Sequence, residues 1–402
     1  MPRSVVRGLG RRTALHRYLL AAVLARLADE GARVALILLA QQRTGSTTFA
    51  GLLVAALLGP QALAAPWAGA LADRTRRPRA LHAAGLLGFA AALASCALAC
   101  GRMPAGLVLG IAVCGGCCGP LVTGGLTGLV RGLAPADRLA RAYSLDAATY
   151  NLAGIAGPTS AVALAGTHGA ATATLTLAAS VTLAAAVILT LPLPPSTRGA
   201  GRPPPSMWPV IARGLASMWC SRPLRAVTFA TTMAQVGLGA LPFAVIVLTR
   251  SQHSVASAGL CLSAMAVGSL AGSLAWAHRP WLSSPPEHIV IGCLAVLALP
   301  LAAIPLVPSL PAGLVCFVLA GVCTGPLTCA LFRCRDREAP ADLHSQVFSL
   351  GAGCKLSAGA LGAVLAGTLA GGGSGALFSF VVALTLGAAG TGAWQLRARG
   401  SA

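Results

Sequence analysis

The stretch Ala134-Pro135-Ala136-Asp137, followed six residues later by Ser144-Leu145, returns 205 residues further on as Ala339-Pro340-Ala341-Asp342, again followed six residues later by Ser349-Leu350. Small residues around the two copies recur at nearly the same spacing: Gly119-Pro120 with Gly325-Pro326, and Gly154, Gly157 and Gly166 with Gly359, Gly362 and Gly371. The offset is about half of the 402-residue chain, so the sequence predicts two structurally similar halves. In membrane proteins, repeated halves of this kind often form transporters with a site between them.

The composition indicates an all-α integral membrane protein. Hydrophobic residues make up 56% of the chain and charged residues only 9%. A membrane-spanning helix needs about 20 apolar residues, and such stretches recur along the whole sequence. We expect twelve transmembrane helices as two six-helix pseudo-repeats, near residues 17–40, 48–68, 80–100, 105–127, 145–166, 170–193, 226–249, 255–276, 289–307, 311–332, 347–371 and 375–395.

The formal net charge of +20 reports topology rather than a nucleic-acid partner. With both termini cytoplasmic, most basic residues fall in the N-terminal tail and the inner loops, among them three at 333–337 that include Arg335, whereas the outer loops carry Arg43, Arg102 and Arg250. This asymmetry is the positive-inside bias of membrane proteins. We therefore expect membrane lipid as a partner, no nucleic acid, and a monomer.

The two halves are joined by the one long hydrophilic segment. We expect six-helix bundles at residues 1–193 and 226–402, and a cytoplasmic linker with an amphipathic helix at residues 194–225. Charges at 26–33 interrupt the first apolar stretch, which we interpret as a retained helix rather than a cleaved signal peptide. One lysine beside 28 arginines indicates a high-GC, actinobacterial-like codon usage, and we expect the plasma membrane of a bacterium.

Residues 69–81 read Gly-Ala-Leu-Ala-Asp-Arg-Thr-Arg-Arg-Pro-Arg-Ala-Leu, and this segment resembles the cytoplasmic-loop signature of the major facilitator superfamily. The matching positions are Gly69, Leu71, Ala72, Asp73, Arg74 and Arg77, while Arg76 and Pro78 depart from the pattern. The resemblance covers the whole chain, because the repeat, the 6+6 layout and the central linker are also the family's. It implies the fold of that superfamily, and it implies that Asp73 meets the N-terminal dipole of the predicted span 347–371 and closes an inner gate. A degenerate second copy begins at Gly272, with Trp276 in place of the aspartate.

The predicted span 145–166 carries a second resemblance. Its segment Gly154-Ile155-Ala156-Gly157-Pro158 is similar to the antiporter motif of the superfamily's drug exporters, although Ala161 and Val162 replace two expected glycines. The chain is therefore similar to drug and metabolite exporters of the family. Small residues here also permit close helix packing.

Four ionisable residues share one face of the predicted span 17–40. They are Arg26, Asp29, Glu30 and Arg33. Their spacing predicts the i,i+4 pairs Arg26–Glu30 and Asp29–Arg33. Charges inside a membrane are costly, at about 2.5–3.5 kcal/mol each on insertion scales, so they face a protein interior and frequently relay protons. The alternative is a structural ion network that fixes this helix against its neighbours.

Lys355 is the single lysine of the chain and lies in the predicted span 347–371. We expect its amine to face the cavity and to pair with Glu30 or Asp29; the alternative is a side chain that extends to the inner membrane surface. Asn151 and Gln235 are the polar candidates for a substrate cavity, and Gln235 stands at the repeat position of Glu30.

The function that these features favour is secondary active transport of a small molecule by alternating access, as proton-coupled efflux. The alternatives are proton-coupled uptake of a small metabolite, and a thiol-based metal-handling protein built on Cys114, Cys117 and Cys118, which we interpret rather as small packing residues. The sequence has no phosphate-binding Gly-rich loop with its lysine and no nucleophile–base set, so we expect neither an enzyme nor ATP hydrolysis. We expect no metal and no cofactor, with a proton gradient as the driving force.

Overall fold

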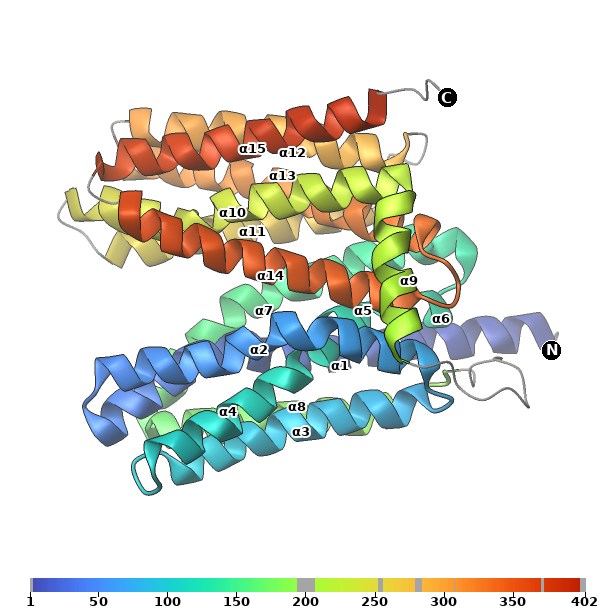
Figure 1. Ribbon diagram of the computed structural model, residues 1–402, viewed down its shortest axis with the longest axis horizontal. Helices are drawn as coiled ribbons and strands as arrows, with labels where there is room; N and C mark the ends of the chain where they lie inside the picture. Colours follow the sequence, from blue (N-terminus) through green and yellow to red (C-terminus); the bar gives the residue numbers. More distant parts are fainter. Residues whose placement is uncertain are drawn as a thin grey trace. The chain divides into compact units, whose positions relative to one another are not determined.

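The computed structural model describes residues 3–193, 207–251, 256–278, 284–307, 309–369 and 372–397, and the regular elements in these ranges are all helices (Figure 1). The first half contains α1 (Arg3–Thr44), α2 (Thr47–Arg74), α3 (Pro78–Ala99), α4 (Ala105–Pro120), the π-helix η1 (Leu121–Gly125), α5 (Leu126–Gly128), α6 (Val130–Leu133), the 3-10 helix η2 (Ala136–Arg138), α7 (Leu139–His168) and α8 (Ala170–Leu189). The second half contains α9 (Met207–Cys220), α10 (Arg222–Ser251), α11 (Ala256–His278), α12 (Pro286–Ala303), the 3-10 helix η3 (Ile304–Leu306), α13 (Leu310–Glu338), α14 (His344–Leu369) and α15 (Gly373–Arg397).

Ten helices of the described chain are long and apolar enough to cross a membrane, and they coincide with ten of the twelve expected spans. The other two expected spans, 17–40 and 145–166, lie within α1 and α7, which have 42 and 30 residues. These helices are long enough to span but less apolar. Four ionisable residues at positions 26–33 interrupt the apolar part of α1, and α7 contains several Gly, Ser and Thr residues. The count of twelve spans and the cytoplasmic placement of both termini stay predictions.

The described chain forms two compact units, and the helices of each unit follow the same contact pattern. Unit 1 comprises Met1–Ala142, Leu152–Leu215 and Pro340–Gly353; unit 2 comprises Tyr143–Asn151, Ala216–Ala339 and Cys354–Ala402. In unit 1, α1 packs on α8, α2 on α4, and α3 on both α4 and α8. In unit 2, α10 packs on α15, α11 on α13, and α12 on both α13 and α15. The sequence repeat is therefore also a structural repeat.

The units are not simple halves of the chain, because α7 and α14 each contribute to both. The first residues of α7 group with the second half, and the first residues of α14 group with the first half. Tyr143–Asn151 and Pro340–Gly353 occupy overlapping positions of the 205-residue repeat. The expected bundles 1–193 and 226–402 therefore describe the order along the chain, whereas the packed units exchange these two helix starts.

Small residues bring helices together at corresponding points of the two units. In unit 1, Gly157 of α7 lies against α1, where a methyl group added to it would lie 2.8 Å from the backbone nitrogen of Gly31. In unit 2, Gly362 of α14 lies in the same way against the backbone of Val236 in α10. Both pairs stand at the same positions of the repeat. Close approach of this kind is typical of helix pairs in membranes, where packing replaces the hydrophobic effect.

The described part of the expected linker, from residue 207 on, is the helix α9, and the segment 194–206 lies outside the described residues. Ile211 is buried against Ala70 and Leu343, and Trp208 makes an edge contact with Trp67 at 5.2 Å between ring centres. Trp219 stays 66% exposed. One side of α9 therefore packs on other residues of unit 1. The exposed apolar residues of α9 are of the kind that lies at a membrane interface.

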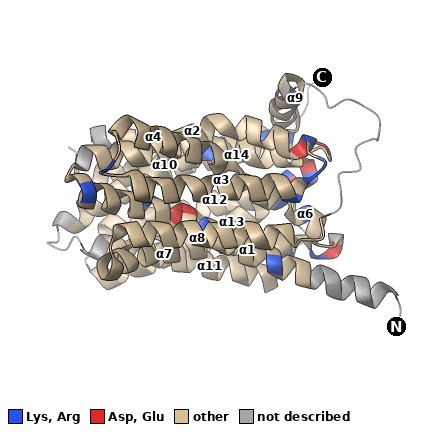
Figure 2. Ribbon diagram, turned by 90° about the horizontal axis from the view of Figure 1, so that it is seen from below, with Lys and Arg blue, Asp and Glu red and all other residues tan. Residues whose placement is uncertain are grey.

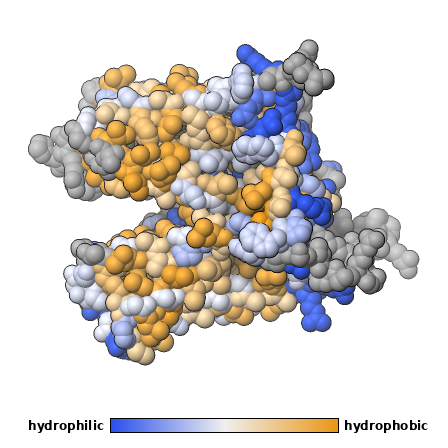
Figure 3. Space-filling model, viewed as in Figure 1, coloured by the Kyte–Doolittle hydropathy of each residue, from blue (hydrophilic) through white to orange (hydrophobic). Residues whose placement is uncertain are grey.

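On the face that Figure 3 shows, large orange, hydrophobic areas cover the helices, and blue, hydrophilic residues gather toward one end. Large hydrophobic side chains are exposed on helices of both units, among them Leu63, Leu183, Leu299 and Leu306 at 54–82%. Charged residues take up little of the helical ribbon in Figure 2. An apolar exterior of this kind is stable in lipid rather than in water.

Candidate functional site

The side chain of Asp73 caps the start of α14. Its two carboxylate oxygens accept hydrogen bonds from the backbone N–H groups of Ser345 and Gln346, at 2.9 and 2.7 Å. These are the second and third residues of α14, where backbone N–H groups have no intrahelical partner. An anion at this position also interacts favourably with the helix dipole. The contact that the family resemblance implied for Asp73 is thus present within unit 1.

Gly69, one turn earlier in α2, makes this capping contact sterically possible. A methyl group at Gly69 would lie 2.6 Å from Cα of Gln346. The side chain of Gln346 is fully buried and also lies against Gly214 of α9. Of the other signature residues, Arg74 ends α2 half-buried and Arg77 is exposed just before α3.

Further polar contacts hold the start of α14 in unit 1. Arg131 of α6 contacts Nε2 of His344, the ring of His344 stacks on Phe348, and Arg213 of α9 pairs with Asp342 at 2.7 Å. Apart from the basic character of the inner loops, no pattern in the sequence indicated these contacts. Together they make the start of α14 the point where α2, α6 and α9 meet.

The four ionisable residues between positions 26 and 33 of α1 form a compact group in unit 1. Arg33 pairs with Asp29 at 3.1 Å, as the i,i+4 spacing predicted, and with Glu30 at 2.9 Å, an i,i+3 contact that the prediction did not include. Arg26 is buried and donates a hydrogen bond of 2.9 Å to Thr127 of α5. One guanidinium is therefore shared by two neighbouring carboxylates.

The two carboxylates differ in their access to solvent. The side chain of Asp29 is only 3% exposed, and its Oδ1 atom is buried with no hydrogen-bond partner in the described chain. The side chain of Glu30 is 31% exposed. A methyl group added to Gly157 of α7 would lie 3.0 Å from Cβ of Glu30. The helix-5 motif thus meets the charge cluster at Gly157, whereas Gly154 faces open space and Pro158 lies inside α7.

The two polar cavity candidates lie in unit 2 and differ in their contacts. The amide of Asn151 is engaged at both ends: it donates to Ser273 at 3.1 Å and accepts from Ser269 at 2.9 Å, both on α11. Gln235 is half-buried in α10, and its amide is the neighbour of Gly359. The sequence did not predict the serine partners of Asn151, because the contact joins residues about 120 positions apart.

Lys355 is partly buried in α14, and its charged neighbour in unit 2 is Arg335 of α13. The expected partners Glu30 and Asp29 belong to unit 1, so that pairing stays a prediction. The sequence placed Arg335 in a basic inner loop, but its side chain is buried at 2% exposure. This burial corrects the assignment of Arg335 to the loop, because α13 extends to Glu338 and carries the residue into the bundle.

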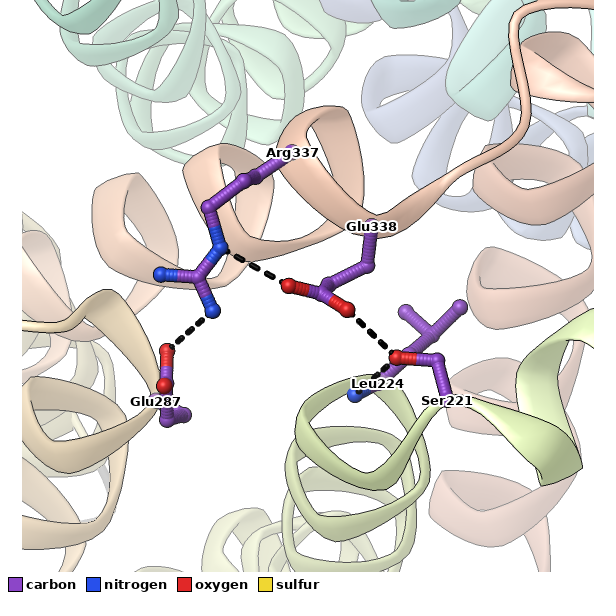
Figure 4. Close-up of polar contacts among 5 residues, drawn as sticks. All are labelled: Ser221, Leu224, Glu287, Arg337 and Glu338. Carbon is purple, nitrogen blue, oxygen red and sulfur yellow. Dashed lines mark hydrogen bonds and ion pairs between the residues drawn. The ribbon is translucent and has the colours of Figure 1, made fainter.

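The last two turns of α13 carry an ion-pair network that joins three helices of unit 2 (Figure 4). Arg337 bonds to Glu287 of α12 and to its neighbour Glu338, both at 2.8 Å. Ser221, just before α10, donates to Glu338 at 2.6 Å. Asp336 accepts from Tyr143 of α7 at 2.7 Å. The two acidic residues at this end of α13, Asp336 and Glu338, therefore both accept hydrogen bonds from neighbouring side chains.

The cysteines show no gathering that would hold a metal. Cys114 and Cys117 are exposed on α4, and Cys118 is intermediate. Among the described residues, no group of three or more His, Cys, Asp and Glu side chains is placed to hold a metal ion. The interpretation of the three thiols as small packing residues stays a prediction.

Long apolar helices, a structural repeat and charge clusters inside it define a multi-pass membrane protein of the transporter class. The sequence model of the Major Facilitator Superfamily matches residues 18–363, and the chain belongs to this family. The resemblance of the loop signature is thereby confirmed at the level of the family.

Individual relatives agree with this assignment. The chain is 27% identical over 384 residues to the protein y4rN of Sinorhizobium fredii (strain NBRC 101917 / NGR234), described as an uncharacterized MFS-type transporter, with 90% of each chain covered. In fold it is similar to a bacterial homologue of the iron transporter ferroportin in an outward-facing state (TM-score 0.76, 14% identity, 95% and 99% covered). It is also similar to the Escherichia coli fucose:proton symporter FucP (TM-score 0.73, 12% identity, 96% and 99% covered).

Proposed function

We propose that this chain is a proton-coupled exporter of a small molecule, working in a bacterial plasma membrane without a bound cofactor. Membership of a transporter family gives the general activity. The direction, the coupling ion and the substrate are the content of the proposal. The observation that carries it is the pair Asp29 and Glu30 on one guanidinium, with one carboxylate oxygen buried and unbonded.

A buried carboxylate oxygen without a partner is costly, and the cost falls when the group takes up a proton. Arg33 is shared by Asp29 and Glu30, and Arg26, the second cation of the cluster, donates to Thr127. A proton on Glu30 removes one of the two carboxylates that share Arg33. Glu30, the more exposed of the two, is the group that exchanges protons with water, and Arg33 then pairs with Asp29 alone.

The close contact at Gly157 links the protonation of Glu30 to the position of α7. Protonated Glu30 no longer holds Arg33 as an ion pair, so its side chain is free to take another rotamer. The backbone of α7 lies directly against Cβ of Glu30. Since α7 contributes residues to both units, a shift at this crossing affects a helix that the units share. The capping of α14 by Asp73 is the corresponding gate contact, made in one conformation and released in the other.

The test is solute counterflow in proteoliposomes against a panel of small metabolites, with and without an imposed pH gradient. We expect Glu30→Gln and Asp29→Asn to abolish flux driven by the gradient, while exchange without a gradient persists. Asp137→Asn is the matched control, because Asp137 is 72% exposed and is paired with its neighbour Arg138 at 3.6 Å. Normal gradient-driven flux in both Glu30→Gln and Asp29→Asn would contradict a role of these carboxylates in proton coupling.

The same experiment separates the alternatives. Accumulation of the solute on the side toward which protons flow down their gradient indicates uptake by symport, the activity for which the E. coli fucose:proton symporter of similar fold is named. The simultaneous replacement of Cys114, Cys117 and Cys118 by alanine leaves transport intact if the proposal holds. Loss of transport in this variant would favour the metal-handling function.

A further inference from the structure

A buried arginine without a counter-charge lies in unit 2. Arg335 of α13 is 2% exposed, and two of its three side-chain nitrogens, Nε and Nη2, are buried with no hydrogen-bond partner among the described residues. A guanidinium carries a full charge and five donors, so leaving it unpaired away from water is strongly unfavourable. Such an arrangement persists when something outside the chain supplies the missing partner.

The surroundings of Arg335 add a second cation and no acid. Its ionisable neighbours in the described chain are Cys334, Cys354 and Tyr150, none of which is a carboxylate. The amine of Lys355, one position beyond Cys354, interacts electrostatically with the same guanidinium. Two cations in one partly buried place repel each other, and this repulsion is relieved by an anion between them.

The acids nearest in sequence are committed elsewhere. Arg337 holds both Glu287 and Glu338, with Ser221 as a further donor to Glu338 (Figure 4). Asp336 accepts the hydroxyl of Tyr143. The fold thus supplies carboxylates to the partly exposed Arg337 and supplies none to the buried Arg335.

We propose that Arg335 and Lys355, beside Tyr150, bind the oxyanion group of a small organic anion, a carboxylate or a phosphate. A guanidinium presents two parallel N–H donors that match either group, and the lysine adds a point charge. The proposal rests on the transport function and names its substrate class. Two unpaired cations also select against cationic substrates, because a cation meets only repulsion there.

The binding test uses the full-length protein in dodecyl maltoside, stripped of phospholipid. Thermal unfolding is followed while sodium phosphate or sodium succinate is added, with sodium chloride at equal ionic strength as the reference. We expect a saturable rise of the unfolding midpoint with at least one oxyanion and none with chloride. Arg335→Gln raises the apparent Kd about tenfold or more, since it removes charge-assisted hydrogen bonds.

Three further variants keep the test sharp. Lys355→Gln weakens anion binding less than Arg335→Gln, and Arg335→Lys gives an intermediate loss, because it keeps the charge but not the planar fork. Arg397→Gln is the control, since it removes the same charge from an exposed position in the last turn of α15. Without anion, Arg335→Gln unfolds at the same or a higher temperature than the unsubstituted protein, whereas a purely structural arginine would give a lower one.

Two results would overturn the site. One is stabilisation by the oxyanions no different from that by chloride, or unchanged in both Arg335→Gln and Lys355→Gln. The other is stabilisation that depends on Arg335 but requires phosphatidylglycerol in mixed micelles, because the site then holds a lipid headgroup. Since this assay contains no membrane and no gradient, its outcome is independent of transport. If the protein binds the anion but shows no flux in proteoliposomes, only the proposed function is contradicted. If it transports uncharged solutes and Arg335→Gln leaves that flux unchanged, only the anion site is contradicted.

Discussion

The carboxylate of Asp73 and the backbone N–H of Ser345 are hydrogen-bonded at 2.9 Å, although 272 residues separate them in the chain. Asp73 belongs to a loop signature of the first half, and Ser345 is the second residue of a helix of the second half. A carboxylate satisfies two N–H groups that a helix start leaves free, so this side chain stabilises the start of α14. The signature residue Asp73 therefore has a defined physical task, which is to cap the start of α14.

Asp73→Asn tests that task. The amide keeps the shape and one acceptor oxygen but loses the negative charge, which near a helix N-terminus contributes about 0.3–1 kcal/mol. We expect faster hydrogen exchange at the amides of Ser345 and Gln346 and a slower transport turnover, with substrate affinity unchanged. Asp137→Asn, on the exposed acid of η2, serves as the control. Turnover equal to that of the unsubstituted protein would count against a gating role for Asp73.

Gly69→Ala tests the same contact through shape rather than charge. The added methyl group would lie 2.6 Å from Cα of Gln346, a distance that backbone atoms cannot tolerate without moving apart. We expect α14 to shift from Asp73, with faster amide exchange at Ser345 and Gln346 even though the carboxylate is intact. Gly59→Ala on the same helix is the matched control, since nothing lies within 4 Å of its added methyl group. Equal exchange rates in the two variants would mean that the close approach is dispensable.

The repeat and the signature predicted much of the architecture, because both are local patterns with a fixed geometric meaning. The 205-residue offset predicted the matching helix contacts of the two units, and the i,i+4 spacing predicted the pair Asp29–Arg33. Hydropathy located ten candidate spans but was weaker for α1 and α7, which carry more polar or charged residues.

The remaining contacts depend on which faces meet across the fold, and a single sequence does not encode that directly. Gly31 looked like any glycine of the first span, yet it marks the crossing with Gly157. Asn151 is a candidate for the substrate cavity, but the sequence did not indicate that its amide is bonded to two serines of α11. Arg335 was counted as an inner-loop charge until α13 proved long enough to bury it.

Arg337→Gln tests the ion-pair network of α13. It leaves Glu287, 8% exposed, without its partner at 2.8 Å, and we expect a loss of about 1–3 kcal/mol of stability for an unsatisfied buried acceptor. The measurement is thermal unfolding of the protein in detergent. Arg337→Gln combined with Glu287→Gln recovers part of the loss, since the stranded charge is gone. Additive losses in this double-mutant cycle would show that the two side chains are not coupled.

Gly157→Ala tests whether proton coupling depends on the contact between α7 and the charge cluster. The added methyl group would lie 2.7 Å from the carbonyl oxygen of Leu27, 2.8 Å from the nitrogen of Gly31 and 3.0 Å from Cβ of Glu30. Two of these three atoms are backbone, so α7 and α1 must separate and Glu30 must move relative to Arg33. We expect gradient-driven flux to fall by about tenfold or more while gradient-free exchange falls less, because a displaced ion pair shifts proton binding before it blocks the substrate path.

Gly154→Ala is the control for this prediction. Gly154 lies one turn earlier on the same helix, and nothing lies within 4 Å of a methyl group added to it. In a helix, alanine in place of glycine is itself stabilising by about 0.5–1 kcal/mol, so this variant should fold at least as well and transport normally. A second comparison uses the repeat: Gly362→Ala disturbs the equivalent crossing in unit 2, where Gln235 replaces Glu30. It should impair exchange with and without a pH gradient alike. If Gly157→Ala and Gly362→Ala lowered both kinds of flux in the same proportion, the crossing at Gly157 would be a packing contact alone, and Glu30 would need another route to α7.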